Sequence, residues 1–337
     1  MKRDMKQWVA DTIAAPVKKP MPVLSFPAVQ LMGITVRDLI SSSEHQAQGM
    51  QLVAQRVDSA AAVSLMDLSV EAECFGSEIR VSDDEVPTVI GSIVTDEDEA
   101  DALAVPEVGA GRTGLYIEAI SKAAQAITDR PVFAGVIGPY SLAGRLLDVS
   151  EAMVLCYEEP DMVHAVMEKT TAFLIDYCKA YKAAGANGVV MAEPLTGMLS
   201  PNLAEEFSHP YVERIVDAVQ DDSFAVIYHN CGNNVVLMAD AIFGLGAMGY
   251  HFGNAIRLAD MLPHAPADRL VMGNVDPAGQ LRNGTPESIR AATLQVMEDC
   301  SRWPNFVPST GCDVPPMSSW ENIDAFFSAV AEFQGRS

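Results

Sequence analysis

Basic residues are scarce in this chain. Its 337 residues include 22 lysines and arginines against 45 aspartates and glutamates, a formal net charge of -23. Such a balance argues against a nucleic-acid or anionic membrane partner, because like charges repel. Long apolar runs are also missing, so the sequence predicts neither a signal peptide nor a transmembrane helix. We therefore expect a cytoplasmic protein.

Cysteine is sparse as well, with six residues in the chain. For a cytoplasmic protein of this size, so few cysteines do not indicate a disulfide framework. Four of them lie in helical or mixed surroundings and are interpreted as buried structural thiols: Cys74, Cys156, Cys178 and Cys300. The other two, Cys231 and Cys312, differ because each follows a strand-like run beside glycine and polar residues.

A glycine-rich dinucleotide fingerprint is also absent after the first apolar run. The nearest candidate, Gly-Val-Ile-Gly at residues 135–138, is too short and lies in the wrong place. This absence disfavours an open Rossmann-like sheet, although counting elements in the sequence does not exclude one.

Short apolar runs alternate with amphipathic segments along the whole chain. The eight runs are residues 22–26, 61–66, 132–137, 188–192, 224–228, 247–251, 270–273 and 306–309. Helical periodicity is clearest in residues 161–184, 202–219, 235–243, 286–300 and 318–333. Alternation of this kind predicts parallel strands joined by helical crossovers, and eight units favour a closed (β/α)8 TIM barrel.

Two parts of the chain fall outside this repeat. Residues 1–20 are predicted to form an N-terminal helical extension. The connection over residues 67–130 is too long for one crossover, and it carries acidic patches at residues 83–85 and 96–99. We expect a partly ordered excursion over the barrel mouth, with its acids in solvent. No composition change marks a linker, so residues 1–337 are interpreted as one domain.

The strongest chemical signal is a pair of potential metal ligands two residues apart. His229 and Cys231 follow the apolar run 224–228, and alternation along an extended chain turns both side chains to the same side. With Cys312 they would supply one imidazole and two thiolates, a set that zinc prefers. Three protein ligands leave one coordination position open, which suggests a catalytic site. An ordinary core histidine with two thiols remains the alternative.

Other reactive side chains follow predicted strands at the expected active-site end of such a barrel. They are Glu193 after the fourth run, His251 at the end of the sixth, and Asn274 and Asp276 after the seventh.

The sequence resembles the uroporphyrinogen decarboxylase superfamily over nearly its whole length. The stretches that carry the resemblance are residues 67–76, residues 138–143, the Glu193-Pro194 pair with Leu199-Ser200-Pro201, and residues 273–277. Within this superfamily, His229-X-Cys231 with a distant Cys312 is similar to the zinc motif of the corrinoid-dependent methyltransferase branch, which includes methylcobalamin:coenzyme M methyltransferases.

The resemblance implies an activity with named roles. A methyl group would pass from a corrinoid on a small partner protein to a small thiol bound at zinc, and His229, Cys231 and Cys312 would hold the metal. Glu193 would be a fourth ligand or a proton acceptor, or else it caps a helix. Asn274 and Asp276 would orient a ligand or substrate, or else they form a turn. His251 would support the site from behind or be structural.

Two other activities remain as alternatives. A uroporphyrinogen decarboxylase needs cations for its many-carboxylate substrate, whereas residues 22–29, which correspond to the arginine-rich segment of that branch, contain no arginine. The other is a non-catalytic barrel that binds a corrinoid or another ligand. The methyl acceptor also stays open between coenzyme M, another thiol and a folate, and the cations that could hold a sulfonate are Arg145, Arg257 and Lys182.

Overall fold

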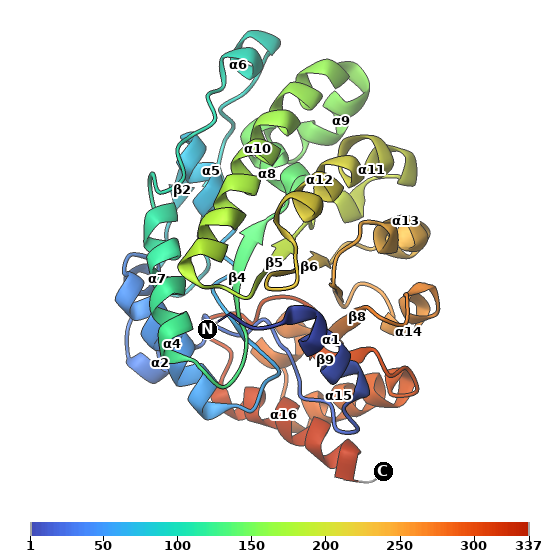
Figure 1. Cartoon of the computed structure of the whole chain (residues 1–337). Helices are drawn as coiled ribbons and strands as arrows, with labels where there is room; N and C mark the ends of the chain where they lie inside the picture. Colours follow the sequence, from blue (N-terminus) through green and yellow to red (C-terminus); the bar gives the residue numbers. More distant parts are fainter. Residues whose placement is uncertain (1, 336–337) are drawn as a thin grey trace.

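Seven parallel strands form a curled sheet in the computed structural model, which describes residues 2–335. The strands are β1 (Ala62–Val63), β4 (Val132–Ile137), β5 (Gly188–Ala192), β6 (Ala225–Asn230), β7 (Gly249–Phe252), β8 (Leu270–Val275) and β9 (Phe306–Thr310). Each pairs with the next one along the chain. Helices surround this sheet (Figure 1). The order and the outer helices confirm the barrel-type α/β fold.

The first predicted strand, residues 22–26, is not a regular strand. The segment nevertheless lies between β9 and β1: the Met21 N–H donates to the Pro308 carbonyl (2.9 Å), and the Ala60 N–H donates to the Pro20 carbonyl (2.8 Å). Pro20 and Pro22 have no N–H to donate, so a continuous ladder cannot form here. The eighth position of the barrel is therefore filled by an extended segment.

The barrel interior is packed with aliphatic and aromatic side chains, and α1 (Met5–Ala14) covers its amino-terminal end. Met5 and Val9 join the interior cluster, and the rings of Trp8 and Phe133 lie 5.6 Å apart. The Met5 N–H also donates to the Asp222 carbonyl at 2.6 Å. In Figure 1, α1 lies in front of the sheet. Residues 1–20 thus contain the expected helix, and its apolar face closes one end of the core.

The remaining helices lie on the outside and in the connections. They are α2 (Ala28–Met32), α3 (Val36–Ile40), α4 (Ser43–Arg56), α5 (Val70–Phe75), α6 (Glu97–Ala102), α7 (Thr113–Ala126), α8 (Pro139–Leu147), α9 (Glu151–Glu158), α10 (Pro160–Ala184), α11 (Pro201–Phe207), α12 (His209–Val219), α13 (Ala239–Gly244), α14 (Leu258–Met261), α15 (Pro286–Cys300) and α16 (Trp320–Gly335), with short turns η1 (Thr196–Met198), η2 (Val235–Met238), η3 (Leu262–His264) and η4 (Pro277–Arg282). Across the described residues, no helix is both long and apolar enough to cross a bilayer.

Two helix predictions need correction. Residues 202–219 form two helices rather than one, because Pro210 lacks an N–H and the chain turns at Ser208 before α12 begins. Residues 235–243 begin with the 3-10 turn η2 and become α-helical only at Ala239.

The long excursion after β1 contains regular helices and strands. It consists of α5, an antiparallel hairpin of β2 (Glu78–Arg80) with β3 (Thr88–Ile90), then α6 and α7. In Figure 1, α6 projects farthest from the sheet. The acidic patches at residues 83–85 and 96–99 are exposed, as expected, and Asp96 caps α6 by accepting from the Glu99 N–H. Both patches therefore lie on the solvated surface, and the second one also caps α6.

Candidate metal centre

The end of β6 carries the first two candidate ligands. This strand runs to Asn230, two residues past the predicted end, so His229 lies on the strand and Cys231 follows it. The Asn230 side chain turns the other way: its amide donates to the Tyr228 hydroxyl (3.0 Å), and its carbonyl accepts from the Gly232 N–H (2.9 Å). The predicted alternation is therefore present, with His229 and Cys231 facing a common space.

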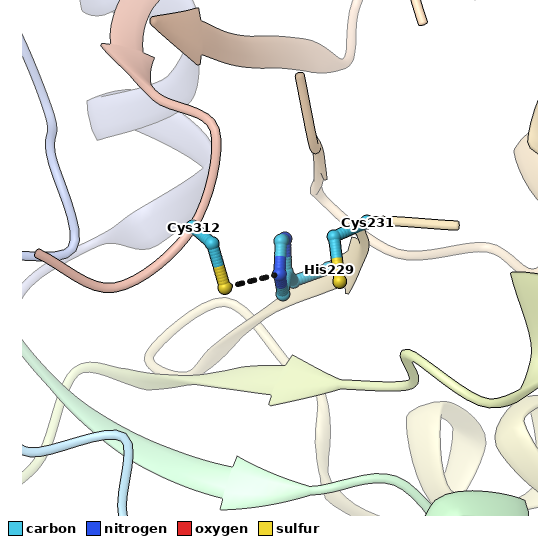
Figure 2. A group of neighbouring side chains, drawn as sticks. All are labelled: His229, Cys231 and Cys312. Atoms are coloured by element: carbon cyan, nitrogen blue, oxygen red, sulfur yellow. Dashed lines mark hydrogen bonds between the residues drawn. The ribbon is translucent and has the colours of Figure 1, made fainter. Parts of the chain in front are cut away.

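Cys312 reaches the same space from the loop after β9. The His229 Nε2 atom lies 3.4 Å from the Cys312 Sγ atom, and one ligand atom from each of the three residues lies within 4.8 Å of the others. Figure 2 shows the two thiols on either side of the imidazole. His229 is buried, whereas both cysteines are partly exposed. The chain thus gathers one imidazole nitrogen and two thiol sulfurs at one place.

The spacing of these atoms fits a tetrahedral ion. Zinc bonds of about 2.3 Å to sulfur and about 2.05 Å to nitrogen, at a tetrahedral angle, place the two donors about 3.6 Å apart. The 3.4 Å between His229 and Cys312 is close to that value. The two thiols also interact: a hydrogen bond with Cys312 lowers the pKa of Cys231, and the same bond raises the pKa of Cys312. One proton shared between two sulfurs is the expected state before a cation replaces it.

A buried hydrogen-bond relay orients the imidazole of His229. The Ser309 hydroxyl donates to the Met21 carbonyl (2.7 Å), so it accepts from His251 Nε2 at 2.8 Å. His251 Nδ1 then accepts a hydrogen bond from His229 Nδ1–H, 2.7 Å away. Burial lowers the pKa of His251 well below its usual range, consistent with a neutral ring. The lone pair of His229 is left on Nε2, facing Cys312.

Close backbone packing holds the ligand loops in place. A Cβ atom at Gly253 would lie 2.5 Å from the Cys231 Cα, and one at Gly311 would lie 2.7 Å from the Asn254 backbone nitrogen. Real Cβ atoms do not approach backbone so closely, so only glycine fits at either position. The end of β7 can therefore lie directly against both ligand-bearing segments.

Glu193 does not join the three ligands. Its carboxylate is fully buried at the N-terminus of α8, where one oxygen accepts from the Tyr140 and Ser141 N–H groups (2.7 and 3.2 Å). The other oxygen accepts from the Ser141 and Thr196 hydroxyls (3.1 and 2.6 Å). Burial raises the pKa of Glu193 to about 7 despite these bonds. Glu193 therefore caps α8, which is the alternative to a role at the metal.

Asn274 and Asp276 are also occupied by backbone contacts. β8 extends to Val275, so Asn274 lies within the strand, and its amide donates to the Gly253 and Ile256 carbonyls (2.9 and 2.8 Å). Asp276 caps η4 by accepting from the Ala278 and Gly279 N–H groups. Asn274 thus fixes the loop after β7. Asp276 stabilises a turn, which was the alternative to orienting a ligand or substrate.

An ion-pair network after β1 was not predicted from the sequence. Arg112, the residue before α7, lies 2.6 Å from the buried carboxylate of Asp67 and 2.6 Å from the partly exposed carboxylate of Glu73. It also donates to Ser69 (2.9 Å), and the Tyr116 hydroxyl donates to Asp67 (2.7 Å). The partners are 39 to 49 residues apart in sequence from Arg112 or Tyr116, so short motifs carry no signal for them. The network fixes the loop that opens the excursion.

A buried glutamate of α5 gives the protein a specific pH dependence. Burial raises the pKa of Glu71 from 4.5 to about 7, and one of its oxygens has no hydrogen-bond partner. The folded chain keeps a proton there that the unfolded chain loses, so this contribution to stability is full below about pH 4.5 and falls as pH rises through 7. We expect Glu71→Gln to reduce the loss of unfolding free energy between pH 5 and 8 by up to about 3 kcal/mol. Urea unfolding at both pH values measures it; the exposed Glu97→Gln should change nothing, and equal loss in Glu71→Gln and wild type would contradict the assignment.

Comparison with known proteins places this geometry in a family. The family model described as uroporphyrinogen decarboxylase (URO-D) matches residues 11–333. The chain belongs to this family. The match includes the β6 pair, Cys312 and all seven strands of the sheet.

The curated relatives described here carry the names of two activities. A methylcobamide:CoM methyltransferase (MtbA) of Methanosarcina mazei is 27% identical and aligns over 80% of this chain and 78% of its own. The Methanosarcina acetivorans protein of the same name is 28% identical with the same coverage. A uroporphyrinogen decarboxylase of Coxiella burnetii is 26% identical over 81% of this chain and 77% of its own.

Solved structures share the fold of this URO-D family chain. A methyltransferase from Methanosarcina mazei superposes with a TM-score of 0.85 at 22% identity and covers 99% of both chains. A B12-independent methionine synthase from Shewanella sp. W3-18-1 reaches 0.61 at 11% identity and covers 95% of each. Because the family contains different reactions, the residues of the site must decide between them.

Proposed function

We propose that this protein is a zinc-dependent methyltransferase that moves a methyl group from a methylated corrinoid to a thiol acceptor. The observation that carries the proposal is the convergence of His229, Cys231 and Cys312 within 4.8 Å at the carboxyl ends of the strands. Names of relatives support it, since two of them are methylcobamide:CoM methyltransferases. The methyl donor would be carried by a small corrinoid protein.

The donor set fits zinc in charge as well as in distance. Two thiolates balance the two positive charges of the ion, and a neutral imidazole adds none, so the site as a whole is uncharged. A zinc ion bound there would lower the pKa of an incoming thiol and keep it as a nucleophilic thiolate at neutral pH. His229 supplies its lone pair because the His251 relay holds the proton on the other ring nitrogen.

The transfer itself is balanced by the two substrates. The carbon–cobalt bond of the donor breaks and leaves its electron pair on the corrinoid, while a carbon–sulfur bond forms at the acceptor. The thiol proton is lost when the thiol binds. The three candidate ligands would position the sulfur of the acceptor. Glu193 takes no ligand role, because four hydrogen bonds hold its carboxylate at the N-terminus of α8.

Decarboxylation of uroporphyrinogen is disfavoured by the shortage of cations. The substrate of that reaction carries many carboxylates, and each one buried without a cation costs several kcal/mol. Of the three cations considered for a sulfonate, Lys182 pairs with Asp221 and bonds the Val219 carbonyl, close to the start of β6, the opposite end from the ligands. Arg257 is exposed and pairs with Asp299. Only Arg145 remains near the mouth.

A direct assay tests the proposed activity. Purified, zinc-loaded protein is mixed with free methylcobalamin and 2-mercaptoethanesulfonate under anaerobic conditions, and loss of the methylcobalamin absorbance is followed. We expect thiol-dependent demethylation with formation of the methyl thioether. A non-catalytic corrinoid-binding barrel would bind methylcobalamin without turnover, and a decarboxylase would act on uroporphyrinogen instead.

The relay behind His229 makes a separate prediction. Replacing His251 with phenylalanine removes the ring nitrogen that accepts from His229 at 2.7 Å and leaves only the His251 carbonyl at 3.2 Å, so zinc affinity is expected to fall about 10- to 100-fold. Competition with a chromophoric chelator measures the affinity. His264→Phe, at an exposed histidine paired with Asp240, is the control and should retain full affinity. Unchanged affinity in His251→Phe would show that the relay does not orient the ligand.

A further inference from the structure

Two of the six cysteines of the chain place their sulfurs against each other. A hydrogen bond joins the side chains of Cys231 and Cys312, and the ligand atoms of the candidate centre all lie within 4.8 Å of one another (Figure 2). Both residues are partly exposed, whereas Cys156, Cys178 and Cys300 are buried. This pair of thiols therefore lies where a small solute can approach it.

The backbone beside each thiol is anchored. The residue before Cys312 donates its N–H to the Val275 carbonyl of β8 (2.7 Å), and the residue before Cys231 accepts with its carbonyl from the Gly253 N–H (3.1 Å). The two sulfurs therefore stay near each other whether or not a metal joins them. A disulfide holds its sulfurs about 2 Å apart, so closing one needs an approach of less than about 3 Å, which rotation about the Cα–Cβ bonds supplies.

Two neighbouring thiols can give up two electrons as a unit. One sulfur attacks an oxygen of hydrogen peroxide and becomes a sulfenic acid, and one water is released. The second sulfur then displaces the hydroxyl group of the sulfenic acid, which forms the disulfide and releases a second water. The thiol protons leave in the two waters, the sulfurs are oxidised, and the peroxide is reduced. A dithiol reverses the change by thiol–disulfide exchange.

A disulfide between these residues would remove two of the three candidate metal ligands. Zinc binds thiolates, and a sulfur that shares its electrons in a disulfide is no longer one. His229 would then remain as the single donor of the set. One neutral imidazole does not replace the two lost charges, so the oxidised site should release the ion.

We propose that Cys231 and Cys312 form a redox switch, in which a peroxide joins the two sulfurs in a reversible disulfide and thereby releases the metal. The switch rests on the proposed zinc-dependent function and describes the regulation of the same site. An accessible thiol with a second thiol beside it is typical of redox-sensitive cysteines. Cys74 is also partly exposed, but its sulfur contacts two backbone carbonyls and a hydroxyl group instead.

Thiol counting and zinc release test the switch in the full chain. Zinc-loaded protein is treated with a small excess of hydrogen peroxide while a chromophoric chelator reports free zinc, and the cysteines still free after denaturation are alkylated and counted by mass spectrometry. We expect the count to fall by two from six, with one peptide pair linked through Cys231 and Cys312. About one zinc per chain should be released. Dithiothreitol followed by zinc should restore both the thiols and the bound ion.

A matched variant and four outcomes decide the result. Cys74→Ser should lose the same two thiols and the same zinc as wild type. The switch is wrong if all thiols stay free with zinc retained, or if Cys231 and Cys312 end as acids that dithiothreitol does not reduce. A disulfide that uses Cys74 or joins two chains, or a Cys231–Cys312 disulfide that leaves zinc bound, would also overturn it.

Demethylation of methylcobalamin by the same preparation, measured before peroxide is added, tests the proposed function separately. Thiol-dependent turnover without later disulfide formation refutes only the switch. Reversible disulfide formation with zinc release, in a chain that shows no turnover beforehand, refutes only the methyl transfer.

Discussion

Cys312→Ser is expected to lower bound zinc from about one ion per chain to near zero and to reduce thiol-dependent demethylation at least about 100-fold. A serine hydroxyl keeps the size of the side chain but is not deprotonated at neutral pH, so the ion loses one of three protein ligands. The loss should exceed the 10- to 100-fold expected for a group that only orients a ligand. Metal analysis and the methylcobalamin assay on one preparation measure both effects.

A second thiol provides the matched control for Cys312. Cys74 lies on α5 and is also partly exposed, and its sulfur contacts the Glu107 and Ala110 carbonyls (3.9 and 3.6 Å) and the Thr113 hydroxyl. A serine there can make similar contacts, so Cys74→Ser should retain full zinc and activity. If Cys312→Ser kept its zinc, or lost it only to the extent that Cys74→Ser does, the three-ligand assignment would be wrong.

Arg112→Met is expected to destabilise the fold by about 3–5 kcal/mol. The arginine side chain is 13% exposed and that of Asp67 is 0% exposed, so removing the cation leaves a buried carboxylate with only hydroxyl and N–H partners. The control is Arg214→Met, whose ion pair with Glu168 has a similar distance of 2.6 Å but side chains 47% and 56% exposed. Water screens that pair, and its loss should cost less than about 1 kcal/mol. Urea unfolding of the two variants beside wild type gives both values.

A second substitution separates the stranded charge from lost packing at Arg112. Adding Asp67→Asn to Arg112→Met removes the uncompensated carboxylate, so part of the stability should return. Similar costs for Arg112→Met and Arg214→Met, or no recovery in the double variant, would show that the buried pair does not hold the loop after β1.

The order of the barrel elements could be predicted because each strand is a short buried run bounded by turn residues. Seven of the eight runs correspond to strands, with ends shifted by up to three residues. The eighth, residues 22–26, has the right place but not the ladder, because apolar periodicity does not register the missing N–H groups of Pro20 and Pro22. Pro210 likewise divides a helix whose apolar face is continuous. Helix and strand ends depend on single N–H groups, whereas the apolar periodicity of a segment reports only which side chains are buried.

The candidate ligands could be predicted because their chemistry and alternation are local. His229 and Cys231 are neighbours on one face of one strand, and Cys312 stands out among six cysteines by its position after a strand. Glu193 could not be separated from a catalytic carboxylate, because the N–H groups that it accepts from lie more than 50 residues away in the sequence.

Zinc-dependent methyl transfer by the three-ligand site is the central claim. The most direct test removes the metal with a chelator, confirms its removal by metal analysis, and follows thiol-dependent demethylation of methylcobalamin as zinc is returned. The account predicts that activity rises in proportion to bound zinc and saturates at about one ion per chain. Full activity in zinc-free protein, or no activity at one bound zinc per chain with both anionic and neutral thiols, would contradict it.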